Sequence, residues 1–535
     1  MKHFLGDLFM KFRNTALSLF VGLAISSSAF AETGEIKHAL LISVDGMHAL
    51  DVERYIANHP NSAFAKLASH GTTYTNARTP ANSDSFPGLL ALVTGGSPVT
   101  HGVFYDVSYD RTYFDPSNKT CAGTPGNWTA YDETIDSYTG VVSNNVIDPT
   151  TLPRRVDASG KCVPVYPHDA LKTNTIFEVI KAAGGRTAWA DKHPAYDLVN
   201  GPSGKGVDDL YTPEITNAPP SGTGFDATVS VICTAQNDNL KVKAIINEID
   251  GFTHDRQKRV GVPAVFGMNF QAVSVGQKLA HDNIDGSCPQ STLTGKAGGY
   301  LDGAGTPTEV LEYGLEQTDA ALQSMIDELN KQGIYDSTLF VVTAKHGQSP
   351  INPAKVNKVG HFADVVAGLN STSDAAAQID IVNNCSTGPC GFINDDDIAL
   401  IWLSDQTKTQ EVAQFLNENA QALFIDEVIA GDELKLKFND PATDSCTPDI
   451  IVQPQYGTIY TKPSKNKNAE HGGFSFADTN VGLIVSNPRF DAKVVKTPVL
   501  SSSVAPTILK ALGIDPQELN SVQVEHTPVL PGLSH

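Results

Sequence analysis

Short apolar runs alternate with amphipathic segments along most of the chain. The run at 38–44 has the length of a buried strand, and further strands are predicted at 186–190 and just before Lys345. The spacing of apolar residues predicts helices over 173–184 and from about 308 to 332, and a last core helix that ends at Gly513. This alternation predicts an α/β fold, with a mostly parallel sheet covered by helices on both faces.

Three polar, Gly- and Pro-rich segments interrupt the pattern, at about 107–168, 197–260 and 362–460. Predicted core strands and helices lie on both sides of each segment. We therefore interpret all three as insertions in one domain that spans 32–535, rather than as separate domains. The third insertion has a predicted helix near 407–420 and a predicted strand at 398–402.

The first 31 residues have the features of a secretory signal peptide. Basic residues precede an apolar run at 16–25, and Ala29 and Ala31 give the small-x-small pattern of a cleavage site. A retained membrane anchor is the alternative, but an apolar run of about ten residues is short for a bilayer, which needs about 20. We expect an exported mature chain that begins near Glu32, is secreted or periplasmic, and does not associate with a membrane.

The chain is acidic, with 38 Lys and Arg against 59 Asp and Glu and a net charge of −21. The first 31 residues carry three basic residues and one acidic residue, which leaves the remainder near −23. This charge disfavours nucleic-acid polymers and anionic membranes as partners. It does not disfavour a small phosphate ester, because capture of such a ligand depends on the local site.

All seven cysteines lie after residue 31, as expected for disulfides in an exported chain. Proximity in sequence predicts the pairs Cys121–Cys162, Cys233–Cys288 and Cys385–Cys390, and leaves Cys446 unpaired. No paired C-x-x-C units occur, so a structural zinc cluster is not expected.

Polar residues follow two of the predicted strands. Asp45 comes directly after the run at 38–44, at the end of a strand where open α/β sheets bind ligands. The alternative is that Asp45 caps the next helix. His193 follows the strand at 186–190 and is either a residue of the substrate mouth or an ordinary loop residue.

Ser85 precedes Phe86-Pro87-Gly88 at the start of an apolar helical run. Backbone N–H groups at a helix N-terminus favour an anion such as phosphate, so a hydroxyl there is a candidate nucleophile. Ser83, two positions earlier, is the alternative nucleophile, and a plain turn role is open for Ser85.

Further motifs follow towards the C-terminus. They are LFVVTAKHG at 339–347, AEHGG at 469–473, VGLIVSNP at 481–488 and VAPTILKALGIDP at 504–516. Together with the segments around Asp45 and Ser85, their order resembles the alkaline phosphatase superfamily, in particular its type I phosphodiesterase / nucleotide pyrophosphatase branch. The resemblance implies an alkaline-phosphatase-like core that carries the insertions.

The resemblance also implies metal ligands. In that family one metal is held by the strand-end Asp, the nucleophile and an Asp-His pair before Gly, and the other by Asp-x-x-Gly-His and the His of His-Gly. Four positions match this pattern: Asp45, Ser85, His346 and His471. Others differ: Lys345 replaces the Asp of Asp-His-Gly, Val273 and Gln277 stand at the Asp and His of Asp-x-x-Gly-His, and Gly88 replaces an Asn.

These replacements change the charge of the implied site. Asp45 and Lys345 sum to zero, which does not offset two dications. We therefore expect at most one divalent metal, zinc, with Asp45, Ser85, His346, His471 and Gln277 as candidate ligands. Lys345 is then a candidate to stabilise the transferring phosphoryl group. The structural alternatives are a salt-bridged Lys345, hydrogen-bonded loop histidines and a structural Gln277.

The resemblance and these residues together predict an exported metal-dependent phosphoesterase, of phosphodiesterase or nucleotide pyrophosphatase type. It would act on a small, nucleotide-like phosphate ester through a phosphoseryl intermediate on Ser85. A phosphomonoesterase is the alternative with the same fold, whereas the Arg that sulfatases place after the Pro is missing here. The alternative from another class is a divergent, non-catalytic member that binds phosphate-containing ligands.

Overall fold

The computed structural model describes residues 35–128, 147–217, 226–384 and 391–533. The predicted signal peptide and the predicted pair Cys385–Cys390 lie outside these ranges. From Ile36 onwards the described residues form one compact unit.

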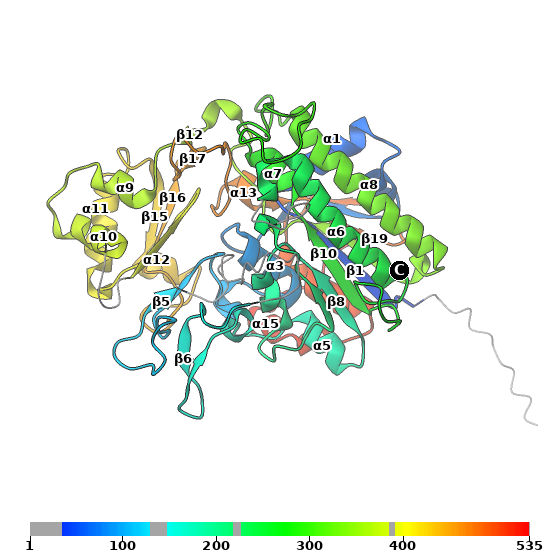
Figure 1. The fold of residues 1–535 in the computed structure, drawn as a ribbon, viewed down its shortest axis with the longest axis horizontal. Coiled ribbons are helices and arrows are strands. Elements are labelled where there is room, and N and C mark those ends of the chain that lie inside the picture. Colours follow the sequence, from blue (N-terminus) through cyan, green and yellow to red (C-terminus); the bar gives the residue numbers. More distant parts are fainter. Residues whose placement is uncertain (1–34, 129–146, 218–225, 385–390, 534–535) are drawn as a thin grey trace, which may run out of the picture. The chain divides into compact units, whose positions relative to one another are not determined.

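An eight-stranded sheet in the described residues has the order β20-β2-β19-β11-β1-β10-β8-β9 (Figure 1). Its strands are β1 (His38–Val44), β2 (Gly71–Tyr74), β8 (Thr187–Ala190), β9 (Asp209–Tyr211), β10 (Val265–Phe270), β11 (Thr338–Thr343), β19 (Ile484–Ser486) and β20 (Lys493–Val495). The five neighbours from β11 to β9 are parallel, and β19 runs antiparallel to both β11 and β2. The mostly parallel sheet predicted from the sequence is confirmed.

Strand β1 lies at the centre of this sheet. Ala39 pairs with Val265 of β10 on one side, and His38 pairs with Thr338 of β11 on the other. Every residue of β1 after His38 is buried, as expected for a parallel strand covered on both faces. This explains why the run at 38–44 is continuously apolar.

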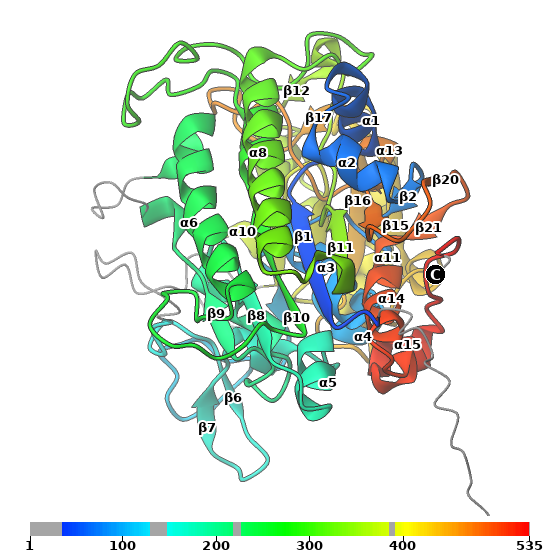
Figure 2. The same cartoon turned by 90° about the vertical axis from the view of Figure 1, so that its right-hand side faces the viewer.

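Helices cover both faces of the sheet, as Figure 2 shows for β1 and β11. On one side α6 (Val231–Ile249) packs against β10 and α8 (Glu309–Lys331), and α7 (Ala272–Lys278) packs against α8. On the other side α3 (Ser85–Thr94), α5 (Ile176–Ala182) and α14 (Val504–Ala511) contact one another. The remaining helices around the sheet are α1 (Ala49–Asn58), α2 (Ala63–Ser69), α4 (Pro98–His101), α13 (Phe476–Thr479) and α15 (Asn520–Glu525).

The predicted helices agree with the observed ones to within a few residues. Helix α8 follows its N-cap Thr308 and ends at the C-cap Gln332, and its buried stripe includes Leu311, Leu315 and Leu322. Gly333 follows with a φ of +69°, the left-handed conformation that ends many helices. The spacing of apolar residues was therefore sufficient to locate this helix.

The interpretation of 197–260 as an insertion differs from the structure. Within it, α6 packs on the central sheet and buries Val231, Ala235, Val242 and Ile245. Polar residues such as Asn237, Asp238 and Lys241 are also buried on this helix, which weakened its apolar pattern in the sequence. The segment therefore contributes a helix of the core layer.

The insertion at 362–460 forms a second sheet with the order β13-β14-β16-β15 (Figure 1). Its strands are β13 (Phe392–Asp395), β14 (Ala399–Trp402), β15 (Ile425–Ala430) and β16 (Ile450–Pro454), and its helices are α9 (Phe362–Ala367), α10 (Asp374–Asn384), α11 (Thr409–Glu418) and α12 (Gly431–Lys435). Apolar clusters around Val412 and Trp402 make this sheet a well-packed element.

Two disulfides link cysteines that are close in sequence. Cys121 pairs with Cys162 and Cys233 with Cys288, as predicted, and Cys446 is unpaired and buried. The first bond lies in the insertion at 107–168, whose short strand pairs are β4 (Tyr109–Asp110) with β5 (Asn127–Trp128) and β6 (Arg154–Val156) with β7 (Cys162–Pro164). Within the described ranges, no helix has both the length and the apolar character that a membrane span requires.

Candidate active site

The carboxyl ends of four adjacent parallel strands bring polar side chains to one edge of the central sheet. In the order β11, β1, β10 and β8, these ends contribute Lys345 and His346, then Asp45, then Asn269, and finally Asp191 and Lys192. All six side chains are buried. This edge is where open α/β sheets bind their ligands.

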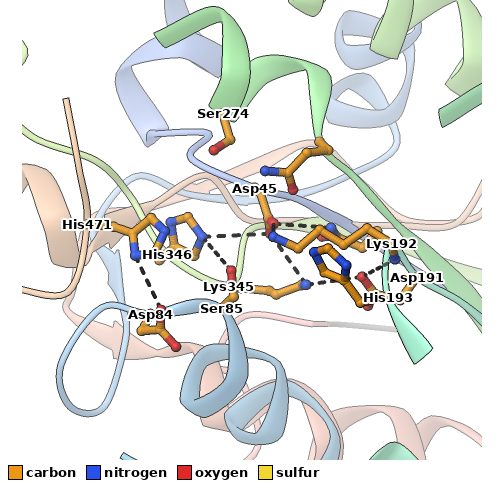
Figure 3. Close-up of polar contacts among 12 residues, drawn as sticks. Asp45, Asp84, Ser85, Asp191, Lys192, His193, Ser274, Lys345, His346 and His471 are labelled. Carbon is orange, nitrogen blue, oxygen red and sulfur yellow. Dashed lines mark hydrogen bonds and ion pairs between the residues drawn. The ribbon is translucent and has the colours of Figure 1, made fainter. Parts of the chain in front are cut away.

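Helix α3 places Ser85 at the same edge. Asp84 is the N-cap of the helix and accepts a hydrogen bond from the backbone N–H of Phe86. Ser85 is the first helical residue, and its side chain points to the group of strand-end residues in Figure 3. The predicted juxtaposition of a strand-end Asp with a hydroxyl at a helix N-terminus is thus present in the structure.

The hydroxyl of Ser85 lies beside the imidazole of His346. Ser85 Oγ is 3.2 Å from His346 Nε2 (Figure 3). His346 Nδ1 is 2.9 Å from the carbonyl oxygen of Gly347. Because a carbonyl only accepts hydrogen bonds, Nδ1 carries the proton and Nε2 accepts from the Ser85 hydroxyl. Burial lowers the pKa of His346 to about 4, so the ring is neutral near pH 7. His346 is therefore in the state that a general base requires.

The hydroxyl of Ser83 is engaged elsewhere. It donates a hydrogen bond to the backbone carbonyl of Asp478. Of the two serines considered as nucleophile, Ser85 is the one that lies beside an imidazole nitrogen.

Two ammonium groups and an imidazole surround the carboxylate of Asp45. Lys345 Nζ lies 3.7 Å from Oδ1, Lys192 Nζ lies 3.8 Å from Oδ2, and His346 Nε2 lies 3.9 Å from Oδ1. Asn269 donates a hydrogen bond to Oδ2 at 3.2 Å. Burial raises the pKa of the Asp45 carboxyl, but Lys345, His346 and Lys192 together lower it below its ordinary value. Asp45 is therefore ionised in a buried site.

Lys345 is fully buried and held by several groups. Its ammonium donates to the Tyr196 hydroxyl at 3.0 Å and to Asp191 Oδ1 at 3.4 Å, and it lies 4.1 Å from the centre of the Tyr196 ring. Burial lowers the pKa of Lys345, and the carboxylates of Asp191 and Asp45 oppose that shift. With two carboxylates within 4 Å, the charged form is the favoured one.

His471 lies on the other side of His346. The two rings are 4.0 Å apart between centroids, and His471 Nδ1 is 3.4 Å from Asp84 Oδ1. Burial lowers the pKa of His471 well below its ordinary value, and Lys278 and His346 add to the shift. His471 is therefore neutral and contacts the N-cap of α3.

Gln277 belongs to a separate buried network behind the loop after Asp45. Its amide donates to the Gly46 carbonyl at 2.9 Å and to the Tyr300 hydroxyl at 3.0 Å, and it accepts from Gln348 at 2.7 Å. The structure therefore does not bring Gln277 together with Asp45, Ser85 and His346, and its contacts match the structural alternative. His193 pairs with Glu214 at 2.8 Å.

Sequence reasoning overlooked Lys192, Asp191 and Asn269. Asp191 and Lys192 directly follow a strand that the sequence did predict, and they lie in the same loop as His193. The rule that singled out Asp45 applies equally to them, so their position after a strand was a usable signal. Asn269 is the second-last residue of the buried strand β10 and carried no such signal.

The side chains at this edge do not fit a divalent metal. In the described part of the chain, no group of three or more His, Cys, Asp or Glu residues is arranged to hold an ion. Two ammonium groups lie within 4 Å of the Asp45 carboxylate, where an ion would have to bind. A dication about 4 Å from one ammonium is repelled by several kcal/mol even at an effective dielectric constant of about 20. The expected single zinc ion on Asp45, Ser85, His346, His471 and Gln277 is therefore not supported by this geometry.

Comparison with known proteins agrees with the fold and the motifs. No curated protein matches the chain in sequence. The murine ectonucleotide pyrophosphatase / phosphodiesterase 5, solved as an inactive variant in complex with AMP, is similar in structure, with a TM-score of 0.50, 14% identity and coverage of 90% of this chain and 96% of that one. The alkaline phosphatase PafA has a TM-score of 0.54 at 13% identity, with the same coverage.

The phosphonoacetate hydrolase from Sinorhizobium meliloti 1021, solved with phosphonoformate, has a TM-score of 0.50 at 16% identity, again over 90% of this chain and 96% of that one. These similarities establish an alkaline-phosphatase-like fold. The family model described as type I phosphodiesterase / nucleotide pyrophosphatase matches residues 39–475, which include the strand-end Asp45, Ser85 and both histidines. The chain therefore belongs to the type I phosphodiesterase / nucleotide pyrophosphatase family.

Proposed function

We propose that the protein is an exported phosphoesterase that cleaves a phosphodiester or pyrophosphate bond of a small, nucleotide-like substrate. The observation that carries this proposal is the contact of 3.2 Å between Ser85 Oγ and His346 Nε2, with the imidazole proton held on Nδ1 by the Gly347 carbonyl. A serine hydroxyl beside a neutral, correctly oriented imidazole is the arrangement that activates an oxygen nucleophile.

The reaction would run in two displacements. Ser85 Oγ attacks phosphorus, its proton passes to His346 Nε2, and the bond from phosphorus to the leaving oxygen breaks as that oxygen takes up a proton from solvent. In the second step a water molecule attacks the phosphoseryl group and releases a proton to solvent, the bond between Oγ and phosphorus breaks, and His346 Nε2 returns its proton to Ser85 Oγ. Lys345 stabilises the charge on the phosphoryl oxygens in both steps.

The surroundings of the site support a small substrate. Ser85 is 2% exposed and His346 is 1% exposed, so only a compact group can reach them without a rearrangement of the chain. The structural neighbours include one complex with AMP and one with phosphonoformate, both small phosphorus-containing ligands. Two disulfides and the N-terminal sequence pattern support export to an oxidising compartment.

Hydrolysis of two chromogenic esters tests this function. The protein without its first 31 residues should release p-nitrophenol from bis-p-nitrophenyl phosphate faster than from p-nitrophenyl phosphate. The opposite preference would identify a phosphomonoesterase. Binding of AMP or phosphate without hydrolysis of either ester would identify a non-catalytic binding protein and would refute the proposal.

A further inference from the structure

We infer that Lys345 and Lys192 take the place of divalent metal ions, so that phosphoryl transfer in this protein requires no bound metal. The inference rests on the proposed phosphoesterase function and deepens it, because it adds Lys192 as a catalytic residue.

The two ammonium groups are distributed over the Asp45 carboxylate. Lys345 Nζ approaches Oδ1 at 3.7 Å and Lys192 Nζ approaches Oδ2 at 3.8 Å, one cation for each oxygen (Figure 3). A carboxylate that bridges two metal ions presents its oxygens in the same way. Asp45 thus holds two positive charges, with no metal involved, in the group of strand-end residues toward which the Ser85 side chain points.

Both distances exceed the reach of a hydrogen bond, so Asp45 attracts the ammonium groups without taking up their protons. Lys345 uses two of its three protons on Tyr196 and Asp191. Its third proton is left to bind an oxygen of a phosphoryl group placed at Ser85. An ammonium held in a water-excluded site stabilises developing negative charge more strongly than it does in water.

The surrounding charges also suit this role. Lys192 lies beside the carboxylate of Asp45, and Lys345 lies beside those of Asp45 and Asp191, so carboxylates offset positive charge in the cluster before substrate binds. A phosphodiester adds one negative charge, which the two ammonium groups can share. A divalent ion would instead add two positive charges beside two ammonium groups, with one bridging carboxylate between them.

Each lysine has a fixed position because of the strand it follows. Lys345 comes two residues after the end of β11, and Lys192 comes two residues after the end of β8. These strands lie on opposite sides of the pair formed by β1 and β10. The two ammonium groups therefore converge on Asp45 from opposite directions along the sheet edge.

Metal content and activity in chelator test the inference. After dialysis against EDTA, the protein should contain less than 0.1 equivalents of zinc, manganese or iron by mass spectrometry. This value is the threshold for adventitious metal. The protein should keep its full rate on bis-p-nitrophenyl phosphate in that buffer. An activity that is lost in EDTA and restored by zinc or manganese would overturn the inference while the proposed function stood.

Substitution of each lysine provides a second test of the inference. In EDTA, Lys345→Met and Lys192→Met should each lower kcat/KM by roughly 10²- to 10³-fold, the scale of one preorganised electrostatic donor. Lys172→Met, which removes an ammonium that pairs with Asp444, should leave the rate within about twofold and is the matched control. Should either Met variant fail to fold, the wild-type measurement in EDTA still decides the question.

A separate binding measurement distinguishes the two possible failures. If no ester is hydrolysed with or without metal, the proposed function is wrong, and binding of inorganic phosphate in EDTA then tests the lysine pair alone. Binding that is weakened at least tenfold in both Met variants supports the pair as an anion site, and binding that requires added zinc overturns it.

Discussion

The backbone of Gly88 packs directly against the carbonyl group of Lys345. A Cβ atom at residue 88 would lie 2.1 Å from the Lys345 oxygen and 2.7 Å from its carbonyl carbon. Glycine is therefore required for this close approach of α3 to the end of β11, and the approach is what brings Ser85 next to His346. The Asn that often follows Phe-Pro in the family has no room here.

Gly88→Ala should impair both stability and turnover. The added methyl group forces α3 or the end of β11 to move, and overpacking of this kind costs roughly 1–3 kcal/mol. Because the shift separates Ser85 from His346, we expect at least a tenfold fall in kcat with little change in KM. Urea unfolding and steady-state kinetics on bis-p-nitrophenyl phosphate measure the two effects. A stable variant with normal kcat would show that the position of α3 does not control the nucleophile.

Ser85→Ala and Ser83→Ala form a matched pair of substitutions. Loss of the Ser85 hydroxyl should lower turnover by about 10³-fold or more, because no other group would form the covalent intermediate. Loss of the Ser83 hydroxyl removes one buried hydrogen bond to the Asp478 carbonyl and should cost about 1 kcal/mol of stability, with turnover within a few fold of wild type. The reverse pattern would identify Ser83 as the nucleophile.

Gln277→Leu should affect folding and not chemistry. The substitution leaves the Gly46 carbonyl and the Gln348 amide without their buried partner, which costs roughly 1–3 kcal/mol for unsatisfied groups of this kind. We expect a lower midpoint of thermal unfolding and unchanged metal content. Loss of bound zinc in the Gln277→Leu variant would instead identify Gln277 as a metal ligand.

The buried imidazole of His101 predicts a loss of stability in acid. Burial lowers its pKa to about 3, below the ordinary value of 6.5 that it regains on unfolding. The neutral ring therefore stabilises the fold fully above pH 6.5, and this contribution is lost as the pH falls from 6.5 towards 3. Between pH 7.5 and 4.5 the loss amounts to about 2–3 kcal/mol.

His101→Asn tests this pH dependence, because its side-chain oxygen can replace Nδ1 as acceptor for the Val103 N–H. When urea unfolding is measured at both pH values, the free energy of unfolding of the variant should fall by about 2–3 kcal/mol less than that of the wild type. Equal losses in both proteins would mean that His101 does not titrate on unfolding.

Local sequence patterns were sufficient to predict site residues whose position depends only on the strand or helix they belong to. Asp45 stands out because it directly follows an apolar strand, and Ser85 because it starts an apolar helix. Lys192 depends on strand order, since it meets Asp45 only because β10 alone separates β8 from β1. A single sequence does not contain that order, so the second ammonium group was overlooked.

The position of a residue in a family motif did not predict its role where the neighbouring motif residues differ from those of the family. Gln277 stands where the family has a histidine ligand, yet its amide is used by Gly46, Tyr300 and Gln348. The contacts of a buried amide are set by side chains from distant segments. Sequence position alone therefore left its role open.

The pairing of β1 has a consequence for the order in which the chain can fold. Strand β1 pairs with β10 from Val265 and with β11 from Thr338, so β1 has neither of its sheet neighbours until residues 265–270 have been synthesised. Contacts so distant in sequence make folding slow. This delay suits the export proposed above, because the first strand leaves the ribosome before the strands that would enclose it in a folded core have been synthesised.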